Sequence, residues 1–500
     1  MRKLLSLMLV AVAAACGAPA YQAPSVRVAP TYGVVSARAA APAVSDSVRP
    51  SSTGVVVRAS EQSRVDPVGQ SAQYSTAVSA EPFWKQIGDP TLARLIEEAL
   101  RASTNVDVAE ARVTGARAER RVSSFDLGPT ITAVGSATRQ RASIVQAPSG
   151  LTGQLPQRDL YDVGFDASWE LDVFGRVKRT VNAYGTLAAS AEHGLHDVQV
   201  SLSAEVARTY FELRGAEQQL AVARRNADNQ RRSLSLTEDR LAAGRGNAFD
   251  TERAKSALQL TLAAIPIVES RIAADQNRIA TLLGRAPGTL PADWLAGGTL
   301  PALPDTVNIG SPEQLVRRRP DVLGAERQLA AQSLFVGAAQ ADYLPRLSLA
   351  ANAGYSATSF DSLSRRGTSR IVAGPVLSWP LLDLGRVKAR VDVAHAREDE
   401  AKAQYSATVL RAIEETETAL VTYDRAHARL ALLNDAVRAS TRASELAQQR
   451  FDAGLTDFLQ VLDAQRTQLE AENQLAAAHT NAATALVAVY KAVGGTWPIK

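Results

Sequence analysis

The 500-residue sequence has little cysteine, histidine and aromatic residue, and each shortage excludes a class of protein. A single cysteine excludes an intramolecular disulfide. Among five histidines, His193 and His196 are spaced i, i+3, but no cysteine or carboxylate cluster nearby completes a metal site, so a solvated helix face is the better interpretation. Phe, Trp and Tyr make up 5% of the chain, which favours long helices packed through small residues.

The charge pattern and the motifs exclude further classes. The formal net charge is +4, and arginines interleave with acidic residues, so the sequence predicts solvated helix faces and no nucleic-acid partner. We find no phosphate-binding loop and no nucleophile motif. The sequence therefore predicts no cofactor, no metal and no enzymatic activity, and any energy must come from a partner.

The first residues have the composition of a secretion signal. Arg2 and Lys3 precede an apolar run over residues 4–15 that is too short to span a bilayer. Cys16 follows at once. We predict a signal peptide over 1–15 and lipidation of Cys16, the alternative being an ordinary secretory signal cleaved near Ala15.

The next segment has no hydrophobic period. Residues 17–80 are rich in Ala, Pro, Ser and Val, so residues 16–80 are predicted to be a lipidated N-terminus followed by a disordered tether. Beyond the signal we expect no transmembrane helix.

An internal repeat organises the remaining chain. Gly175-Arg176-Val177-Lys178 recurs 210 residues later as Gly385-Arg386-Val387-Lys388. The same offset relates these pairs: Gly164 and Gly374, Trp169 and Trp379, Gly244 and Gly454, Gly284 and Gly494. Shared helical composition does not place glycines, tryptophans and a four-residue block in one register, so we interpret the pattern as a duplication. We place the repeats at 81–284 and 311–497, with a linker or equatorial segment at 285–310.

Each repeat opens with alternating segments. In Val163-Phe165-Ala167-Trp169-Leu171 the intervening residues are polar or small, a period of two that indicates a strand with one apolar and one polar face. Four such strands are expected, at about 129–141, 161–172, 345–357 and 370–382.

Long helical runs follow the strands. Residues 176–240 contain no proline and would extend about 100 Å as an α-helix. That run and its repeat at 386–450 each end at a glycine turn, followed by a residue that can cap a returning helix. The turn and cap residues are Gly244 and Asn247 in the first repeat, Gly454 and Asp457 in the second. Pro266 should kink the first returning helix.

Strands with an apolar face, joined to such hairpins, indicate insertion into a membrane as an oligomer. Four strands cannot close a barrel, and an open edge in lipid leaves N–H and C=O groups unpaired. Two chains give eight strands with a filled interior, whereas three give twelve, the smallest set that leaves a lumen. Trp169 and Trp379 lie at the strand ends nearest the helices and fit a membrane-interface aromatic belt, the alternative being packing inside a soluble domain.

Several motifs follow one another along the chain. They are Phe83-Trp84 before Asp89-Pro90-Thr91-Leu92, Arg318-Arg319-Pro320-Asp321-Val322, Leu382-Asp383-Leu384-Gly385-Arg386, Ala453-Gly454 through Val461-Leu462-Asp463-Ala464-Gln465-Arg466, and the terminal Tyr490 to Trp497. In this order, over about 81–497, they resemble the lipoprotein branch of the TolC-like outer membrane factor family. The resemblance implies a mainly α fold with a membrane β-barrel part. It implies a homotrimer with a twelve-stranded barrel in outer-membrane lipid, a periplasmic α-barrel, and docking to a periplasmic adaptor and an inner-membrane pump.

The resemblance also implies a gate. Leu459, Asp463 and Arg466 match residues that line the periplasmic constriction in lipoprotein channels of this family, and their i, i+4, i+7 spacing puts them on one helical stripe. The alternative is an exposed Asp–Arg pair with the leucine in ordinary helix packing. The turns with Gly244 and Gly454 would be the tips that meet an adaptor.

We therefore predict a passive exit duct for small solutes, lipid-anchored in the outer membrane and extending into the periplasm. A periplasmic coiled-coil adaptor or scaffold without a pore is the alternative, and the sequence identifies no cargo.

Overall fold

The computed structural model describes residues 30–33, 73–75, 82–141, 157–295, 300, 302–304 and 306–495. The predicted signal peptide, Cys16 and Trp497 lie outside the described residues. Contacts divide the chain into two compact units. The first contains residues 111–193 and 324–407, and the second contains 26–110, 194–323 and 408–500.

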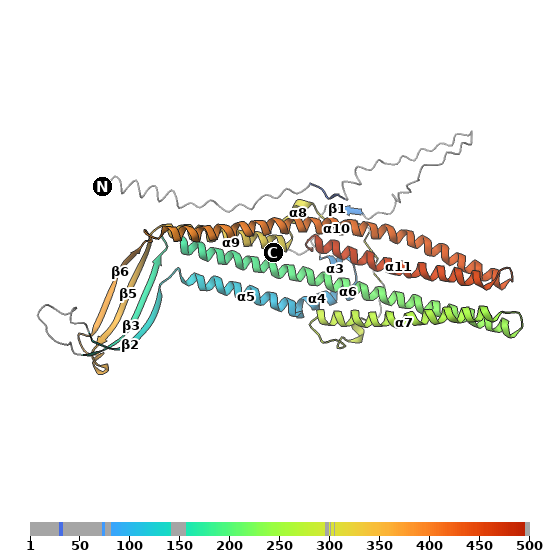
Figure 1. Ribbon diagram of the computed structural model, residues 1–500, viewed down its shortest axis with the longest axis horizontal. Helices are drawn as coiled ribbons and strands as arrows, with labels where there is room; N and C mark the ends of the chain where they lie inside the picture. The colour runs from blue at the N-terminus through green and yellow to red at the C-terminus, as the bar shows by residue number, and fades with distance from the viewer. Residues whose placement is uncertain are drawn as a thin grey trace, which may run out of the picture. The chain divides into compact units, whose positions relative to one another are not determined.

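The first unit holds one antiparallel sheet, built from both repeats (Figure 1). Its strands are β2 (Thr130–Gln140), β3 (Arg158–Leu171), β5 (Arg346–Ala357) and β6 (Ser369–Ser378). The order β2-β3-β5-β6 makes β3 and β5 neighbours and leaves β2 and β6 as the outer strands of the described sheet. The prediction of four strands is confirmed, although β6 ends before the dipeptide Trp379-Pro380, four residues short of the predicted bound at 382.

Four helices continue from the strands. They are α5 (Thr104–Phe125), α6 (Arg176–Ala242), α9 (Pro320–Gln340) and α10 (Leu384–Asp452), and each has residues in both units. The chain turns from β3 into α6 at Gly175, whose φ of 72° is readily adopted only by glycine. The Asp172 carboxylate accepts the N–H groups of Val177 at 3.0 Å and Lys178 at 2.7 Å, which satisfies the free N–H groups of the first turn of α6.

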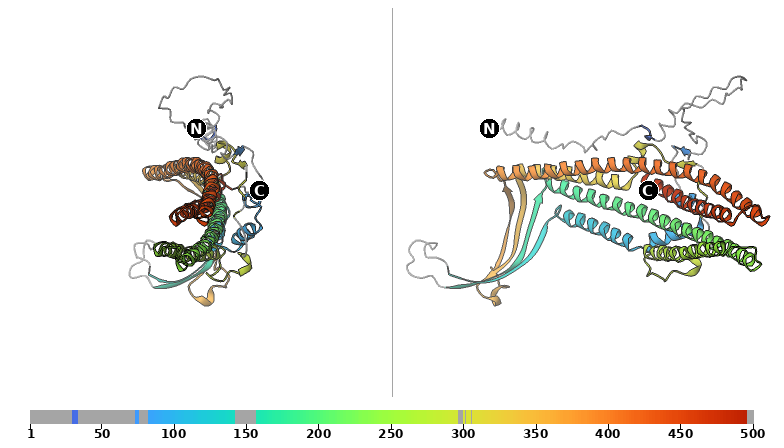
Figure 2. Two further views of the ribbon diagram at one scale, coloured as in Figure 1. Left: turned by 90° about the vertical axis from the view of Figure 1, so that its right-hand side faces the viewer. Right: turned by 45° about the vertical axis from the view of Figure 1, so that its right-hand side comes forward.

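In the second unit each long helix is followed by a returning helix. The returning helices are α7 (Ala248–Leu282) and α11 (Phe458–Ala492), which begin and end 210 residues apart and so confirm the duplication. Figure 2 shows these hairpins from two further directions.

Helix α7 continues as one helix through Pro266 to its end, and the kink expected at this proline stays a prediction. It is also long and apolar enough, by length and composition, to cross a membrane, so the expectation that no such helix follows the signal is wrong by that criterion. Only 11% of its most apolar window is buried in the protomer, and Leu260 and Ile267 are more than 70% exposed.

A compact core at the base of the hairpins completes the second unit. The smaller elements are β1 (Gln73–Ser75), α3 (Phe83–Gln86), α4 (Pro90–Ala102), η2 (Ala292–Trp294), β4 (Thr306–Asn308) and α8 (Pro312–Val316); the turns η3 (Ala341–Tyr343) and η4 (Phe360–Ser362) belong to the first unit. Phe83 stacks on Tyr490 of α11 at 5.1 Å, and Asp89 caps α4 while accepting the Tyr210 hydroxyl at 2.6 Å.

Two short segments of the predicted tether pack on this core. Residues 73–75 form β1, which pairs in parallel with β4, and Tyr32 is 2% exposed. Composition alone did not indicate these contacts, because single aromatic side chains such as Tyr32 and Tyr74 carry no period.

Candidate functional site

One face of the sheet is apolar and the other is mostly polar, and this difference extends across all four strands. Phe165 lies opposite Ala133 and Ala353, and Ala353 lies opposite Ile371, so one row of apolar residues crosses all four strands. That face carries Ile131, Ala133, Ala137, Tyr161, Val163, Phe165, Ala167, Trp169, Leu171, Leu347, Leu349, Ala351, Ala353, Tyr355, Ile371, Ala373, Pro375 and Leu377. Its large residues are exposed or half-buried, with Phe165 at 60% and Ile371 at 79%, as a lipid-facing surface requires.

The opposite face carries most of the polar residues of the strands. Arg370 lies 3.7 Å from Asp162, and the Asn352 amide donates to the Asp166 carboxylate. Val134, Val372 and Val376 also lie on this face. A polar face backed by an apolar one suits a sheet that separates water from lipid.

The predicted interface tryptophans are held alike at the helical end of the sheet. The Trp169 indole Nε1 donates to the Leu127 carbonyl at 3.0 Å, and the Trp379 Nε1 donates to the Tyr343 carbonyl at 3.1 Å. Trp169 lies on the apolar face of β3. Trp379, one residue beyond the end of β6, continues the apolar alternation of that strand and is 49% exposed. Each indole therefore meets a polar backbone group while its ring stays accessible, which is how an interfacial tryptophan is used.

The two hairpin tips have the same backbone geometry. Gly244 has φ of 71° and Gly454 has φ of 73°. One residue further, the Arg245 N–H donates to the Arg240 carbonyl and the Leu455 N–H to the Arg450 carbonyl, each at 2.8 Å. This is the left-handed C-terminal motif that ends many helices at glycine.

The predicted caps begin the returning helices. The Asn247 side chain accepts the Phe249 N–H at 2.9 Å, and the Asp457 side chain accepts the Gln460 N–H at 3.2 Å. The tips are therefore short, defined turns with little side-chain cover, and Leu455 is 71% exposed.

The predicted gate residues share one solvent-facing stripe at the start of α11. Leu459 is 47% exposed, and Asp463 and Arg466 are exposed beside it. On the opposite face of the same helical turns, Phe458 and Val461 are buried in an apolar cluster. Among the described residues neither Asp463 nor Arg466 forms an ion pair, so both charges remain available to another chain.

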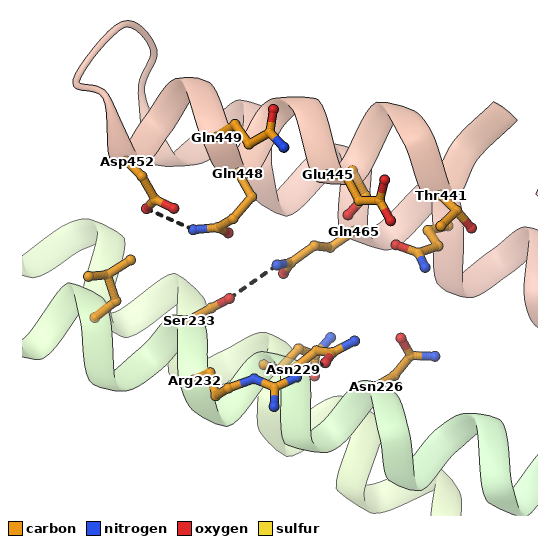
Figure 3. A pocket seen from close by; sticks show the side chains of 14 residues that line it. Asn226, Asn229, Arg232, Ser233, Thr441, Glu445, Gln448, Gln449, Asp452 and Gln465 are labelled. Atoms are coloured by element: carbon orange, nitrogen blue, oxygen red, sulfur yellow. Dashed lines mark hydrogen bonds between the residues drawn. The ribbon is translucent and has the colours of Figure 1, made fainter. Parts of the chain in front are cut away.

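A polar groove lies behind this stripe, between α6 and the second hairpin (Figure 3). Its volume is about 680 Å³. One hydrogen bond crosses it, from the Gln465 Nε2 to the Ser233 Oγ at 3.1 Å. The Gln465 Oε1, the Asn226 Nδ2 and the Gln230 Oε1 are buried without a partner in the described part of the chain, and polar atoms in a groove of this size are suited to water.

A second contact joins the hairpins near their tips. The Arg240 guanidinium lies 3.8 Å from the centre of the Phe451 ring and donates to the Phe451 carbonyl at 3.2 Å. Sequence reasoning missed both this contact and the Gln465–Ser233 bond. Each depends on the register between two hairpins, for which the sequence gives no signal beyond an apolar residue, Phe451, at the end of a polar run.

Comparison with known proteins gives the family. The profile of the outer membrane efflux protein family matches residues 95–285 and 311–495. The chain belongs to the outer membrane efflux protein family. It is similar to the toluene efflux pump outer membrane protein TtgI of Pseudomonas putida, at 31% identity covering 86% of this chain and 91% of the relative. Outer membrane protein OprJ of Pseudomonas aeruginosa is also 31% identical, over 86% and 89%.

A solved structure agrees with the sequence relatives. The outer-membrane channel OprN superposes with a TM-score of 0.82 at 35% identity, covering 96% of this chain and 99% of that one. Membership of this efflux family makes the protein an outer-membrane exit duct of a tripartite efflux system. It is a trimeric channel in which three copies of the sheet form a twelve-stranded barrel and the hairpins form a periplasmic α-barrel. The alternative of a pore-free adaptor is not supported by these relatives.

Proposed function

We propose that the trimer is a passive duct closed at its periplasmic end by the α11 stripe of Leu459, Asp463 and Arg466. The observation that carries this proposal is that all three side chains are exposed on one face while the described protomer offers the two charges no ion-pair partner. Around a threefold axis the stripe makes a ring of leucines and a ring of carboxylates. A narrow hydrophobic ring blocks water and solutes by dewetting.

Pairing between neighbouring protomers would hold the ring closed. An Asp463–Arg466 pair in a constricted, partly dry pore is stronger than the same pair in open water, where it is worth at most about 1 kcal/mol. The polar groove behind α11 supports movement at this point, because its lining is polar and one hydrogen bond crosses it from α11 to α6. Beside the groove, Phe458 and Val461 of α11 pack in an apolar cluster with Leu234 and Leu236 of α6.

The hairpin tips are the proposed docking points for a periplasmic adaptor, which in turn connects an inner-membrane pump. The exposed Leu455 and the uncovered glycine turns give a surface on which adaptor helices can pack. The apolar sheet face is the surface in contact with outer-membrane lipid, and an acylated Cys16 would add an anchor. Conduction needs no catalysis, so the pump supplies the energy.

The cargo class follows only from relatives. Proteins similar to this chain are named for toluene and solvent efflux. We therefore propose small organic solutes as cargo, selected mainly by the pump because a wide duct selects weakly.

Single-channel conductance of the trimer in planar bilayers tests the gate. Leu459→Ala and Asp463→Ala should each give a wider or leakier resting pore with the trimer retained, and exchanging the charges in Asp463→Arg/Arg466→Asp should restore part of the closure. Arg253→Ala is the matched control, because Arg253 occupies the position of Asp463 in the other repeat. Unchanged conductance in all the α11 variants would place the constriction elsewhere.

A further inference from the structure

A second groove lies in the first unit, among α6, α9 and the first turns of α10, which run side by side in Figure 1. Its volume is about 810 Å³. Tyr184 and Phe335 form an edge-to-face pair at 5.6 Å in its lining, next to Leu187. Val393 of α10 also lines the groove and is 52% exposed. Half-buried aromatic and aliphatic side chains thus give the groove an apolar lining.

Three arginines of α10 add a row of positive charge. Arg386, Arg390 and Arg397 are spaced i, i+4, i+11 and so lie on one stripe of the helix that faces the groove. Arg386 is paired with Asp383 at 2.7 Å. Within the described ranges, Arg390 and Arg397 have no ion-pair partner and the groove lining contains no carboxylate.

We propose that this groove binds an amphiphilic organic anion, a single apolar body that ends in a carboxylate or an equivalent acid. The apolar lining would cover the body, since burying apolar surface provides the general driving force of such binding. Arg390 and Arg397 would bind the acid group, because a guanidinium matches a carboxylate with two parallel hydrogen bonds. A neutral solute would leave the two charges unused, and a small anion would leave the apolar lining uncovered.

The ligand is a water-soluble amphiphile rather than a bilayer phospholipid. Arg397 lies thirteen residues after the start of α10 at Leu384, about 20 Å along the helix axis. The strand end at Ser378 and the interfacial Trp379 lie before that start. A phospholipid whose chains stay in the membrane would reach Arg386 but not Arg397.

Site-resolved photolabelling tests the proposal on the intact trimer, reconstituted in phosphatidylcholine nanodiscs. The probe is laurate that carries a diazirine near the end of its chain, and the labelled peptides are read by mass spectrometry. Label is expected on peptides that contain Leu187 or Phe335. Excess laurate should compete for this labelling, whereas 1-dodecanol and butyrate at the same concentration should not.

Charge variants give the decisive comparison. Arg390→Gln/Arg397→Gln should lower the labelling about tenfold or more, as expected for the loss of charge-assisted hydrogen bonds, while Arg390→Lys should retain much of it. Arg411→Gln is the matched control, since Arg411 is an exposed arginine of the same helix outside the groove. Ala389→Trp, which fills the groove and keeps the charges, should also lower labelling. Trimer content is measured for every variant.

Four results would overturn the proposal. Labelling that survives the double variant removes the role of the arginines. Equal competition by 1-dodecanol makes the site merely apolar. Labelling displaced only by phosphatidylglycerol in the nanodisc makes the ligand a membrane lipid. Absence of label on the trimer, together with loss of trimer in the double variant, makes the groove a contact between copies of this chain.

Discussion

Arg319 reaches Glu415 in the middle of α10, with its Nη2 2.7 Å from the Glu415 Oε2. The same guanidinium pairs with Asp321 and donates to the Ala492 carbonyl at the end of α11 at 3.0 Å. Its side chain is 9% exposed. One arginine, just before α9, therefore ties together the start of one helix, the middle of a second and the end of a third.

Removing this side chain should be costly. Arg319→Ala leaves two carboxylates and a carbonyl without their cation. Breaking a fully buried ion pair costs about 3–5 kcal/mol, and this is an upper bound here because the Asp321 and Glu415 side chains are 27% and 48% exposed. Apparent Tm of the purified trimer measures the loss. Arg317→Ala is the control: its pair with Glu313 is 76% exposed on both sides and should change stability by less than about 1 kcal/mol. Equal effects of the two variants would contradict the role of Arg319.

The carboxyl group of Asp197, which is affected by the charges of Asp321 and Arg319, predicts that the stability of the protein depends on pH. Burial, and then the negative charge of Asp321, raise the pKa of the Asp197 carboxyl. Between its ordinary pKa and the raised one, the folded state holds a proton that the unfolded state has lost, so stability rises as pH falls through that window. At neutral pH the ionised carboxylate remains a cost to the folded state.

Asp197→Asn should therefore raise the apparent Tm at neutral pH, and its advantage should shrink as the solution is acidified. Thermal unfolding across a pH series measures this. Glu238→Gln, at an exposed position of the same helix, supplies the control and should show no such convergence. A variant less stable than the parent at every pH would show that the carboxylate contributes favourable contacts instead.

The sheet faces predict opposite responses to charge. Phe165→Arg places a cation on the lipid side and should cost about 2–4 kcal/mol at mid-membrane depth, whereas Leu377→Arg, two residues before the interfacial Trp379, should cost less. Ser168→Arg, on the polar face, should be tolerated, and it is a cleaner control than a change at Asp166 because Asp166 accepts the Asn352 amide. Heat-modifiable gel mobility reports the trimer. Equal loss of trimer on both faces would reverse the assignment.

The sequence predicted the elements better than their contacts. The strands are predicted by the alternation at Phe165 and Trp169, and the hairpins by the repeat of Gly244 as Gly454. These patterns suffice because each element is encoded within one segment of the sequence. The Arg240–Phe451 contact and the groove with Ser233 were not predictable, since they depend on how one hairpin is shifted against the other. The family resemblance and the i, i+4, i+7 spacing likewise predicted the stripe of Leu459, but not the groove behind it.

The N-terminal anchor is open to direct measurement. If Cys16 is the acylated first residue of the mature chain, mass spectrometry of the N-terminal peptide should show cysteine with added acyl groups. Cys16→Ser should abolish the added mass. An unmodified N-terminus beyond Cys16 would remove the anchor and leave the channel unaffected.

The tip glycines allow backbone strain to be separated from docking. A Cβ at Gly244 or Gly454 meets nothing within 4 Å, so a substitution there acts on the protomer only through its positive φ. Gly454→Asn should be tolerated, because asparagine adopts the left-handed backbone conformation, whereas Gly454→Val should cost about 1–2 kcal/mol locally.

If the tips dock an adaptor, Gly454→Trp should abolish efflux of a small organic solute from whole cells while the trimer persists in the membrane. Glu238→Trp, a bulky change on an exposed face before the first tip, is the control for size alone. Intact efflux and intact trimer in Gly454→Trp and Gly244→Trp together would remove the support for docking at the tips.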